Sequence, residues 1–387
     1  MLARMQELAA WLTSLECRAL EGRALIEALI PAFHRAGLEF ERFSISIHTR
    51  HPELWVQNFM WSEAEGLSLA LRDSSLRRHP RYLDSPVAQV YAGKDEVRVQ
   101  LPEQAAHYPV TQELSEQGYR DYLCLALPAR QRSFVSFATR KVGGFGETTL
   151  AELRALVPLL ALRMELASER TATSSLLRTY LGPNAARHVL AGRFRRGEGQ
   201  PIEAVIWSCD LRGFTSLVDS TEIGEVLRTL DAYFECVADP IAAQGGEVLK
   251  FIGDAVLGIF TGPMHEACSA ALHAAQEAFA ALETLNEARA ERGQAPLRFG
   301  VALHRGVVTY GNIGAHERLD FTVIGPAVNE VTRVESLCKQ LDCSLLLTAA
   351  FARACAPPQR EQLRSLGQHP LRGVAEPVEL FTLDARA

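Results

Sequence analysis

The sequence predicts two α+β domains, and three observations support this prediction. The chain has 387 residues, which is more than a single hydrophobic core usually organises. Its second half places strands and helices in the order βαββαβ, the arrangement of a ferredoxin-like fold. Its first half combines a helical segment with short strands of alternating polarity.

Residues 1–145 form the first predicted domain, a mixed α+β module. Apolar and polar residues follow a helical period from about residue 4 to residue 36. Strands are then predicted at 42–50, 54–61, 96–101, 121–129 and 133–140, with a turn at 51–53 between the first two. The segment between 62 and 95 shows no regular pattern.

Residues 146–200 are predicted to be a helical linker. Leu150, Leu153, Val157, Leu160 and Met164 recur at spacings of three and four, which makes an apolar seam along a helix. The seam can pair with another copy of the chain as a coiled coil, or it can pack on its own domain; both alternatives remain open. A proline at position 158 should bend or break the helix.

Residues 201–387 form the second predicted domain. Its expected elements are a buried strand at 204–209, a helix at 215–246, a hairpin at 247–260, a helix at 264–293 and a strand at 297–306. In this topology the first strand lies beside the hairpin. Asp210 ends the first strand and Asp254 lies at the hairpin tip, so their carboxylates should meet at one edge of the sheet. Two facing carboxylates need a cation or a shared proton, and hard oxygen ligands suit Mg²⁺ or Mn²⁺.

Other residues of this domain are suited to binding phosphate or a base. Gly213 lets the backbone turn before a helix whose first amide groups can bind phosphate. Gly325 begins a helix on which Asn329 and Arg333 lie four residues apart on one face. On the strand before the hairpin tip, Lys250 is either an edge lysine or a donor to a buried acceptor.

Composition excludes several classes of protein. The net charge is −6 and no basic tract is present, so nucleic acid is not an expected partner. No apolar run approaches the roughly 18–20 residues of a membrane span, and no signal peptide is visible, so we expect a soluble, cytoplasmic protein. Eight scattered cysteines, none in a CxxC pair, are expected to be reduced core residues.

Four motifs now indicate a family. CDLRGFT (209–215), KFIGD (250–254), RFGVALHRGVVTYGNIG (298–314) and FTVIGPAVNEVTR (321–333) occur in the order and at the spacing of class III nucleotidyl cyclases. Residues 201–382 therefore resemble the catalytic domain of adenylyl and guanylyl cyclases, and PLRGVAEPVELF (370–381) is similar to the closing strand of that family.

The resemblance implies roles for individual residues. It implies that Asp210 and Asp254 hold two divalent cations, Mg²⁺ or Mn²⁺, and that the loop with Leu211, Gly213, Phe214 and Thr215 cradles the triphosphate. It further implies that Lys250 and Thr322 read the purine, that Asn329 orients the ribose, and that Arg333 stabilises the transition state. Arg372 is a further candidate for contact with the triphosphate. Family members are head-to-tail homodimers in which the aspartates come from one protomer and the other residues from its partner.

The purine pair favours ATP over GTP. A lysine donates a hydrogen bond to N1 of adenine, and a threonine hydroxyl can accept one from the 6-amino group. We therefore expect an adenylate cyclase that converts ATP to 3′,5′-cyclic AMP and pyrophosphate. The alternatives are a guanylate cyclase and a catalytically silent receptor that uses the cyclase fold only to dimerise.

The N-terminal module resembles a GAF domain. The similarity lies in GYRDYLCLALPA (118–129) and SFATRKVGGFGETTLAEL (136–153). It implies a sensor domain that binds an unidentified small molecule or signal and regulates the cyclase through the linker.

Overall fold

The computed structural model describes residues 2–48, 56–128, 130, 132–374 and 376–383. The chain divides into two compact units, unit 1 (Met1–Thr179) and unit 2 (Tyr180–Ala387). Both units combine helices with mainly antiparallel strands, so the predicted α+β class is confirmed. Among the described residues, no helix has both the length and the apolar character needed to cross a bilayer.

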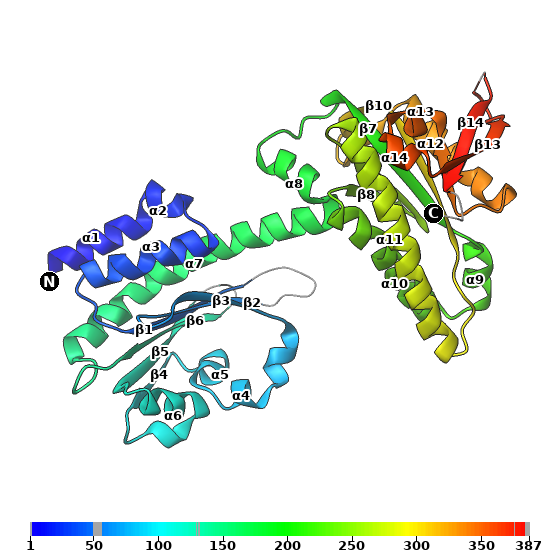
Figure 1. Ribbon diagram of the computed structural model, residues 1–387. Helices are drawn as coiled ribbons and strands as arrows, with labels where there is room; N and C mark the ends of the chain where they lie inside the picture. Colours follow the sequence, from blue (N-terminus) through cyan, green and yellow to red (C-terminus); the bar gives the residue numbers. More distant parts are fainter. Residues whose placement is uncertain (1, 49–55, 129, 131, 375, 384–387) are drawn as a thin grey trace. The chain divides into compact units, whose positions relative to one another are not determined.

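Unit 1 is built on a six-stranded antiparallel sheet with strand order β3-β2-β1-β6-β5-β4. Its strands are β1 (Arg42–His48), β2 (Val56–Ser62), β3 (Gly66–Arg72), β4 (Glu96–Gln100), β5 (Asp121–Leu127) and β6 (Ser133–Thr139). Its helices are α1 (Leu2–Thr13), α2 (Leu15–Ala19), α3 (Gly22–Arg35), η1 (Ser74–Arg78), α4 (Pro80–Leu83), α5 (Pro86–Tyr91), η2 (Ala105–His107) and α6 (Pro109–Glu116), followed by the long α7 (Glu147–Leu181). Helices α1, α3 and α7 cover one face of the sheet and α4 to α6 the other (Figure 1).

The predicted strands of unit 1 are present, and one strand was missed. β3 falls in the segment without a predicted pattern, although Leu67, Leu69 and Leu71 alternate in it. None of its side chains is buried, because β3 is an edge strand of the sheet. The turn expected at 51–53 lies outside the described residues.

The apolar seam at the start of α7 packs inside unit 1. Leu150, Leu153, Leu160 and Met164 are buried in the core that α7 shares with α1, α3 and the sheet. The structure therefore shows the second of the two alternatives for this seam, in which the helix packs on its own domain. The helix continues through Pro158 instead of breaking there, because buried side chains on both sides of the proline hold it against the core.

Unit 2 has the predicted βαββαβ order with a C-terminal extension. Its sheet runs β13-β14-β12-β10-β7-β9-β8, and β11 pairs with β10. The strands are β7 (Gly199–Leu211), β8 (Glu247–Ile252), β9 (Ala255–Phe260), β10 (Phe299–Gly314), β11 (Leu319–Ile324), β12 (Leu345–Thr348), β13 (Leu363–His369) and β14 (Val378–Leu383). The helices are α8 (Pro183–Leu190), α9 (Phe214–Ser220), α10 (Ile223–Ala243), α11 (Met264–Glu291), α12 (Pro326–Gln340), α13 (Ala349–Ala354) and α14 (Pro357–Arg360).

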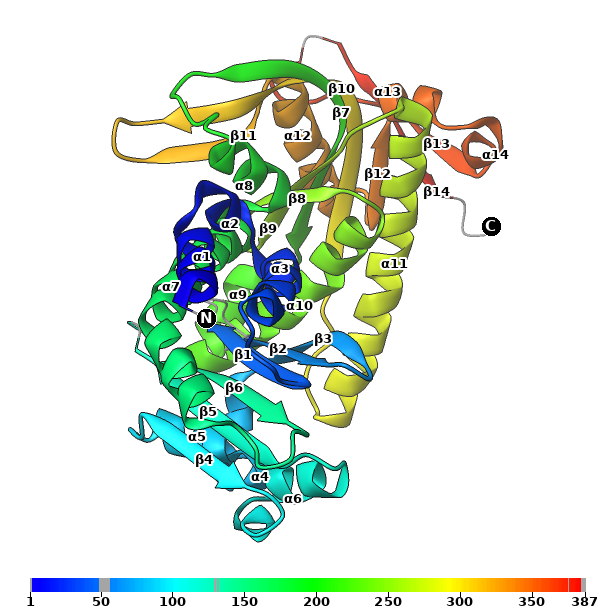
Figure 2. The ribbon, with the colours of Figure 1, turned by 90° about the vertical axis from the view of Figure 1, so that its left-hand side faces the viewer.

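The helices of unit 2 bury opposite faces of its sheet. Alternate residues of β7 and β10 pack against α10 and α11 on one face, and the intervening residues pack against α8 and α12 on the other. Figure 2 shows α11 and α12 alongside this sheet. The units divide within the segment expected to be a linker, because Ala185 and Ala186 of α8 are buried in unit 2.

Candidate functional site

Two aspartates of unit 2 lie together at one edge of its sheet. Cys209 of β7 is paired with Val256 of β9, so Asp210 lies next to the turn that joins β8 to β9. Gly253 provides that turn with a φ of 65°, and Asp254 follows it. Burial, together with a hydrogen bond and charge repulsion from Asp254, raises the pKa of Asp210 to about 7. The convergence predicted from the strand order is therefore present.

A third carboxylate near this pair was not predicted. Burial and the negative charges of Asp210 and Asp254, opposed by the positive charge of Arg212, raise the pKa of Glu335 on α12 to about 7. A Cβ atom on Gly300 would lie 3.5 Å from Oε1 of Glu335, and Gly300 is paired with Asp210 in the sheet. One sequence feature could have indicated this residue. Glu335 follows Val331 by four residues, which places it beside the apolar face of α12.

The turn after Asp210 exposes backbone at the start of α9. Leu211 is buried, and the amide of Arg212 donates to the carbonyl of Arg298 at 2.7 Å. Gly213 has a φ of 77°, which a glycine adopts without strain, and no atom lies within 4 Å of a Cβ built there. Phe214 packs against the core while Thr215 is exposed. The loop thus leaves room for a ligand beside the aspartate pair.

Lys250 and Thr322 lie on strands β8 and β11, which contact each other. Lys250 forms an ion pair with Asp320, a residue that was not predicted to belong to the site. Thr322 is 7% exposed, and its hydroxyl has no hydrogen-bond partner among the described residues. A buried hydroxyl without a partner is costly, so Thr322 has an unused capacity for a ligand hydrogen bond.

Asn329 and Arg333 lie on one face of α12. The helix begins at Pro326 after Gly325, as predicted. Asn329 is exposed, and Arg333 forms no hydrogen bond or ion pair within the described part of the chain. The Arg333 guanidinium nitrogens lie 3.4 and 3.6 Å from the position of a Cβ on Gly373, which directly follows the exposed Arg372.

The candidate residues form two groups within the chain. In the described residues, no hydrogen bond or ion pair joins Asp210 or Asp254 to Lys250. The first group contains the aspartate pair and the loop after Asp210. The second contains Lys250 and Thr322 on the contacting strands β8 and β11, and Asn329 and Arg333 on α12, and its donors are of the kinds that bind an oxyanion or a base.

Residues 200–384 match the family described as "Adenylate and Guanylate cyclase catalytic domain". They are a class III cyclase domain. The cyclase domain is 34% identical over 194 residues to an adenylate cyclase of Anabaena cylindrica, in a match that covers 49% of this chain and 38% of that protein. It is 30% identical over 214 residues to adenylate cyclase 2 of Rhizobium meliloti, covering 54% of this chain and 57% of the relative. This chain thus spans less than two thirds of either relative.

A solved structure of a bacterial light-regulated adenylyl cyclase is similar with a TM-score of 0.52 and 23% identity, over 67% of this chain and 84% of that one. At this identity the likeness concerns the fold. It agrees with the mixed α+β architecture of the cyclase domain.

Proposed function

We propose that the chain is an adenylate cyclase that converts ATP to 3′,5′-cyclic AMP and pyrophosphate. The observation that supports ATP most directly is that Lys250 and Thr322 lie on the contacting strands β8 and β11, where the Thr322 hydroxyl has no partner among the described residues. The ammonium group can donate to N1 of adenine, and the hydroxyl can accept from the 6-amino group. Guanine carries a hydrogen on N1, which would oppose the lysine. Two relatives named adenylate cyclases support the same choice.

The aspartate pair fits two divalent cations, Mg²⁺ or Mn²⁺. Asp210 and Asp254 are hard oxygen donors, and burial together with their mutual repulsion raises the pKa of Asp210; a cation between them would relieve that repulsion. No group of three or more His, Cys, Asp or Glu in the described chain is placed to hold a metal ion, so other ligands would come from phosphate oxygens and water. Bound ions would supply positive charge at the reacting phosphate and lower the pKa of the ribose 3′-hydroxyl.

The remaining residues would position the nucleotide and neutralise charge. The amides after Gly213 bind the triphosphate, and Asn329 orients the ribose. The guanidinium of Arg333 has no hydrogen-bond or ion-pair partner among the described residues, which leaves it available for charge that develops on the phosphoryl oxygens. Arg372 is next to Gly373, against which Arg333 lies, so it can contribute to the same anion.

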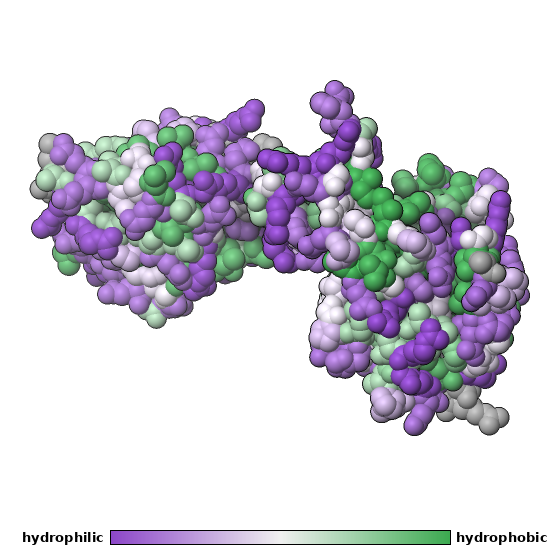
Figure 3. Space-filling model, turned by 90° about the horizontal axis from the view of Figure 1, so that it is seen from above, coloured by the Kyte–Doolittle hydropathy of each residue, from purple (hydrophilic) through white to green (hydrophobic). Residues whose placement is uncertain are grey.

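A homodimer would bring the two groups of residues together. Among the described residues, no hydrogen bond or ion pair joins the aspartates to Lys250 or Arg333, as expected if each complete site takes one group from each protomer. Phe251, Ile252 and Ile324 are 49%, 57% and 51% exposed on β8 and β11. Figure 3 shows hydrophobic surface on unit 2. Such a surface is suited to association.

Product formation from ATP and from GTP tests this proposal. The purified chain is incubated with each nucleotide in Mg²⁺, in Mn²⁺ and with a chelator. Metal-dependent cyclic AMP is the expected product, and Asp210→Ala should abolish it. Cyclic GMP would instead establish the guanylate cyclase alternative. No product from either nucleotide, with a chain that dimerises, would support the silent receptor.

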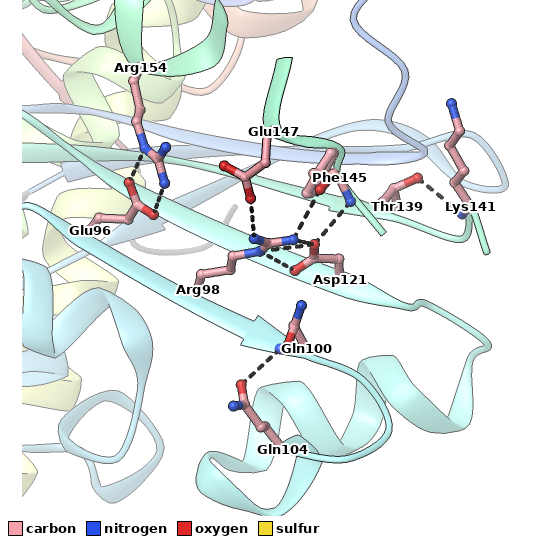
Figure 4. A network of polar contacts seen from close by, with 10 residues as sticks. All are labelled: Glu96, Arg98, Gln100, Gln104, Asp121, Thr139, Lys141, Phe145, Glu147 and Arg154. Atoms are coloured by element: carbon pink, nitrogen blue, oxygen red, sulfur yellow. Dashed lines mark hydrogen bonds and ion pairs between the residues drawn. The ribbon is translucent and has the colours of Figure 1, made fainter. Parts of the chain in front are cut away.

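We further propose that unit 1 is a GAF-like sensor that regulates the cyclase. In unit 1 a polar network joins the sheet to the start of α7 (Figure 4). Arg98 bonds Asp121 at 2.7 Å and the carbonyl of Phe145 at 3.0 Å, and Arg154 of α7 bonds Glu96 of β4 at 2.7 and 2.8 Å. A change in the sheet would thereby reach the helix that leads into the cyclase domain.

A further inference from the structure

Unit 1 contains a cavity of about 280 Å³ that the proposed cyclase chemistry does not use. Its floor is one face of the sheet, formed by alternate residues of β1, β2 and β6, and α4 and α5 close it from the other side. Tyr82, Val87 and Phe134 are among the side chains that make its walls largely apolar. The other face of the same strands packs on α1, α3 and α7.

The charged residues that line this cavity, within the part of the chain that the structure describes, are all cations. Arg42, Arg72 and Arg81 line it, and no Asp or Glu is among its described lining residues. Arg81 is ion-paired with Glu113 at 2.8 Å, but Arg42 and Arg72 have no hydrogen-bond or ion-pair partner in the part of the chain that the structure describes. Arg42 is half-buried and Arg72 exposed. Cations without counterions at an apolar cavity favour an anionic occupant.

The floor of the cavity adds hydrogen-bond donors. The Ser44 hydroxyl donates to Oδ1 of Asn58 at 3.2 Å, which leaves the Nδ2 hydrogens of Asn58 without a partner among the described residues. Ser46 is satisfied by Ser133 at 2.7 Å. The polar groups of the floor that remain without a partner are therefore mainly hydrogen-bond donors, which an anion requires.

We infer that this cavity binds a small organic anion, with an aromatic or aliphatic body between the sheet and α5 and a carboxylate or similar group at Arg42. The volume suits a body of one or two rings. Arg72 lies at the opposite end, because it is paired with Val56 whereas Arg42 is paired with Ser62. Arg42 is the main anchor because it is the more buried of the two arginines. This inference is independent of the proposed cyclase activity.

Two fluorescent probes that share one ring system test the inference in the full-length chain. 8-Anilinonaphthalene-1-sulfonate carries an anionic group, and N-phenyl-1-naphthylamine lacks it. Arg42→Gln should weaken sulfonate binding about tenfold and Arg72→Gln about threefold, and neither should change the affinity for the neutral probe. Arg4→Gln, on the exposed surface of α1, is the charge-matched control and should change neither affinity.

Retained binding of the neutral probe shows that each variant still has its cavity. Val87→Trp, which fills the cavity from α5, should remove binding of both probes. One-ring and two-ring aromatic carboxylates should displace the sulfonate probe, while their uncharged amides should not. Equal sulfonate affinities in the wild type and Arg42→Gln, equal losses for both probes, or sulfonate binding that survives Val87→Trp would each overturn the inference.

Discussion

The ammonium group of Lys250 on β8 forms an ion pair with the carboxylate of Asp320 on β11. Asp320 is two residues before Thr322, so it is on the same face of the strand as the second proposed purine-reading residue. One carboxylate engages one of the three donors of the lysine and leaves two for a ligand. The contact therefore fixes the direction of Lys250 before nucleotide binds.

Removing this carboxylate should reduce the preference for ATP. In Asp320→Asn the lysine loses its fixed direction, so kcat/KM for ATP should fall about tenfold, which corresponds to about 1.4 kcal/mol. Turnover of GTP should change less, so the ratio of the two kcat/KM values falls. Glu317→Gln, an exposed change just before β11, is the control and should leave the ratio unchanged. An unaltered ratio in Asp320→Asn would show that the ion pair does not direct purine choice.

The raised pKa of Asp210 predicts a pH-dependent stability in the absence of metal. Because the folded-state pKa, about 7, lies above the ordinary value of 3.8, the folded state binds more protons between these pH values. This contribution to stability is present below pH 4 and is lost as the pH rises through about 7. Asp254→Asn removes the repulsion, so it should stabilise the metal-free protein at pH 8 relative to pH 4.5.

Denaturant unfolding in a chelator at both pH values measures this effect. Because Asp210 is partly exposed to solvent, a difference on the order of 1 kcal/mol is expected. Asp219→Asn, on exposed α9, should show no such difference. If Asp254→Asn destabilises the protein equally at both pH values, the two carboxylates do not repel each other in solution.

Glu335 should strengthen cation binding at the aspartate pair. Its charge acts on Asp210 and Asp254, so Glu335→Gln should raise the metal concentration for half-maximal activity about threefold to tenfold. Activity at saturating metal should be nearly unchanged, because the variant keeps both proposed ligands. Glu283→Gln on the exposed face of α11 is the control. A loss of activity that added metal does not restore would indicate a different role for Glu335.

How well the sequence predicted each residue of this site depended on the structural information that fixes the position of that residue. Asp210 and Asp254 could be paired because strand order alone decides which strand ends are neighbours. Glu335 could not be placed, because its approach to Asp210 depends on how α12 rotates on the sheet. Asp320 was missed because no strand was predicted at 319–324, so the pairing of β11 with β10 and its contact with β8 were not considered.

The boundary of unit 2 also could not be predicted without knowing the tertiary contacts of the chain. Residues 146–200 were predicted to be a helical linker, yet α8, which lies in this range, packs on the sheet of unit 2. Asn184 Nδ2 and the Tyr310 hydroxyl donate to Glu247 at 2.8 and 3.0 Å, and Glu247 is 5% exposed. A buried carboxylate of this kind requires both donors. A fragment that starts at residue 180 should therefore fold, whereas one that starts at 196 leaves Glu247 without a donor from α8.

Urea unfolding of the two fragments compares them, together with Asn184→Ala in the longer one. The free energy of unfolding of the fragment from 196 should be about 1–3 kcal/mol lower than that of the fragment from 180. Asn184→Ala in the longer fragment should lower it by about half of that amount. The Arg187 side chain donates to Asn184 of the same helix and to no other described residue, so Arg187→Ala should cost less than about 1 kcal/mol. Equal stability of the two fragments would show that α8 does not belong to unit 2.

The ion pair between Arg98 and Asp121 should be essential to unit 1. The Asp121 side chain is 1% exposed, and besides Arg98 it accepts from the amide of Phe145 at 3.0 Å. Asp121→Asn removes the counter-charge of Arg98 from a buried position, so unit 1 should lose about 3–5 kcal/mol. Thermal unfolding of the full chain should then show a lower first transition, with the transition of unit 2 unchanged.

The neighbouring pair provides the comparison for that variant. Arg154 is 46% and Glu96 is 27% exposed on the side chain, so Glu96→Gln should cost less than about 1 kcal/mol. It should nevertheless weaken the connection between β4 and α7. If unit 1 regulates the cyclase through this helix, Glu96→Gln will retain a folded unit 1 and basal cyclic AMP formation, while the response to an organic anion falls. A full response in Glu96→Gln, with probe binding unchanged, would show that the signal does not pass through this contact.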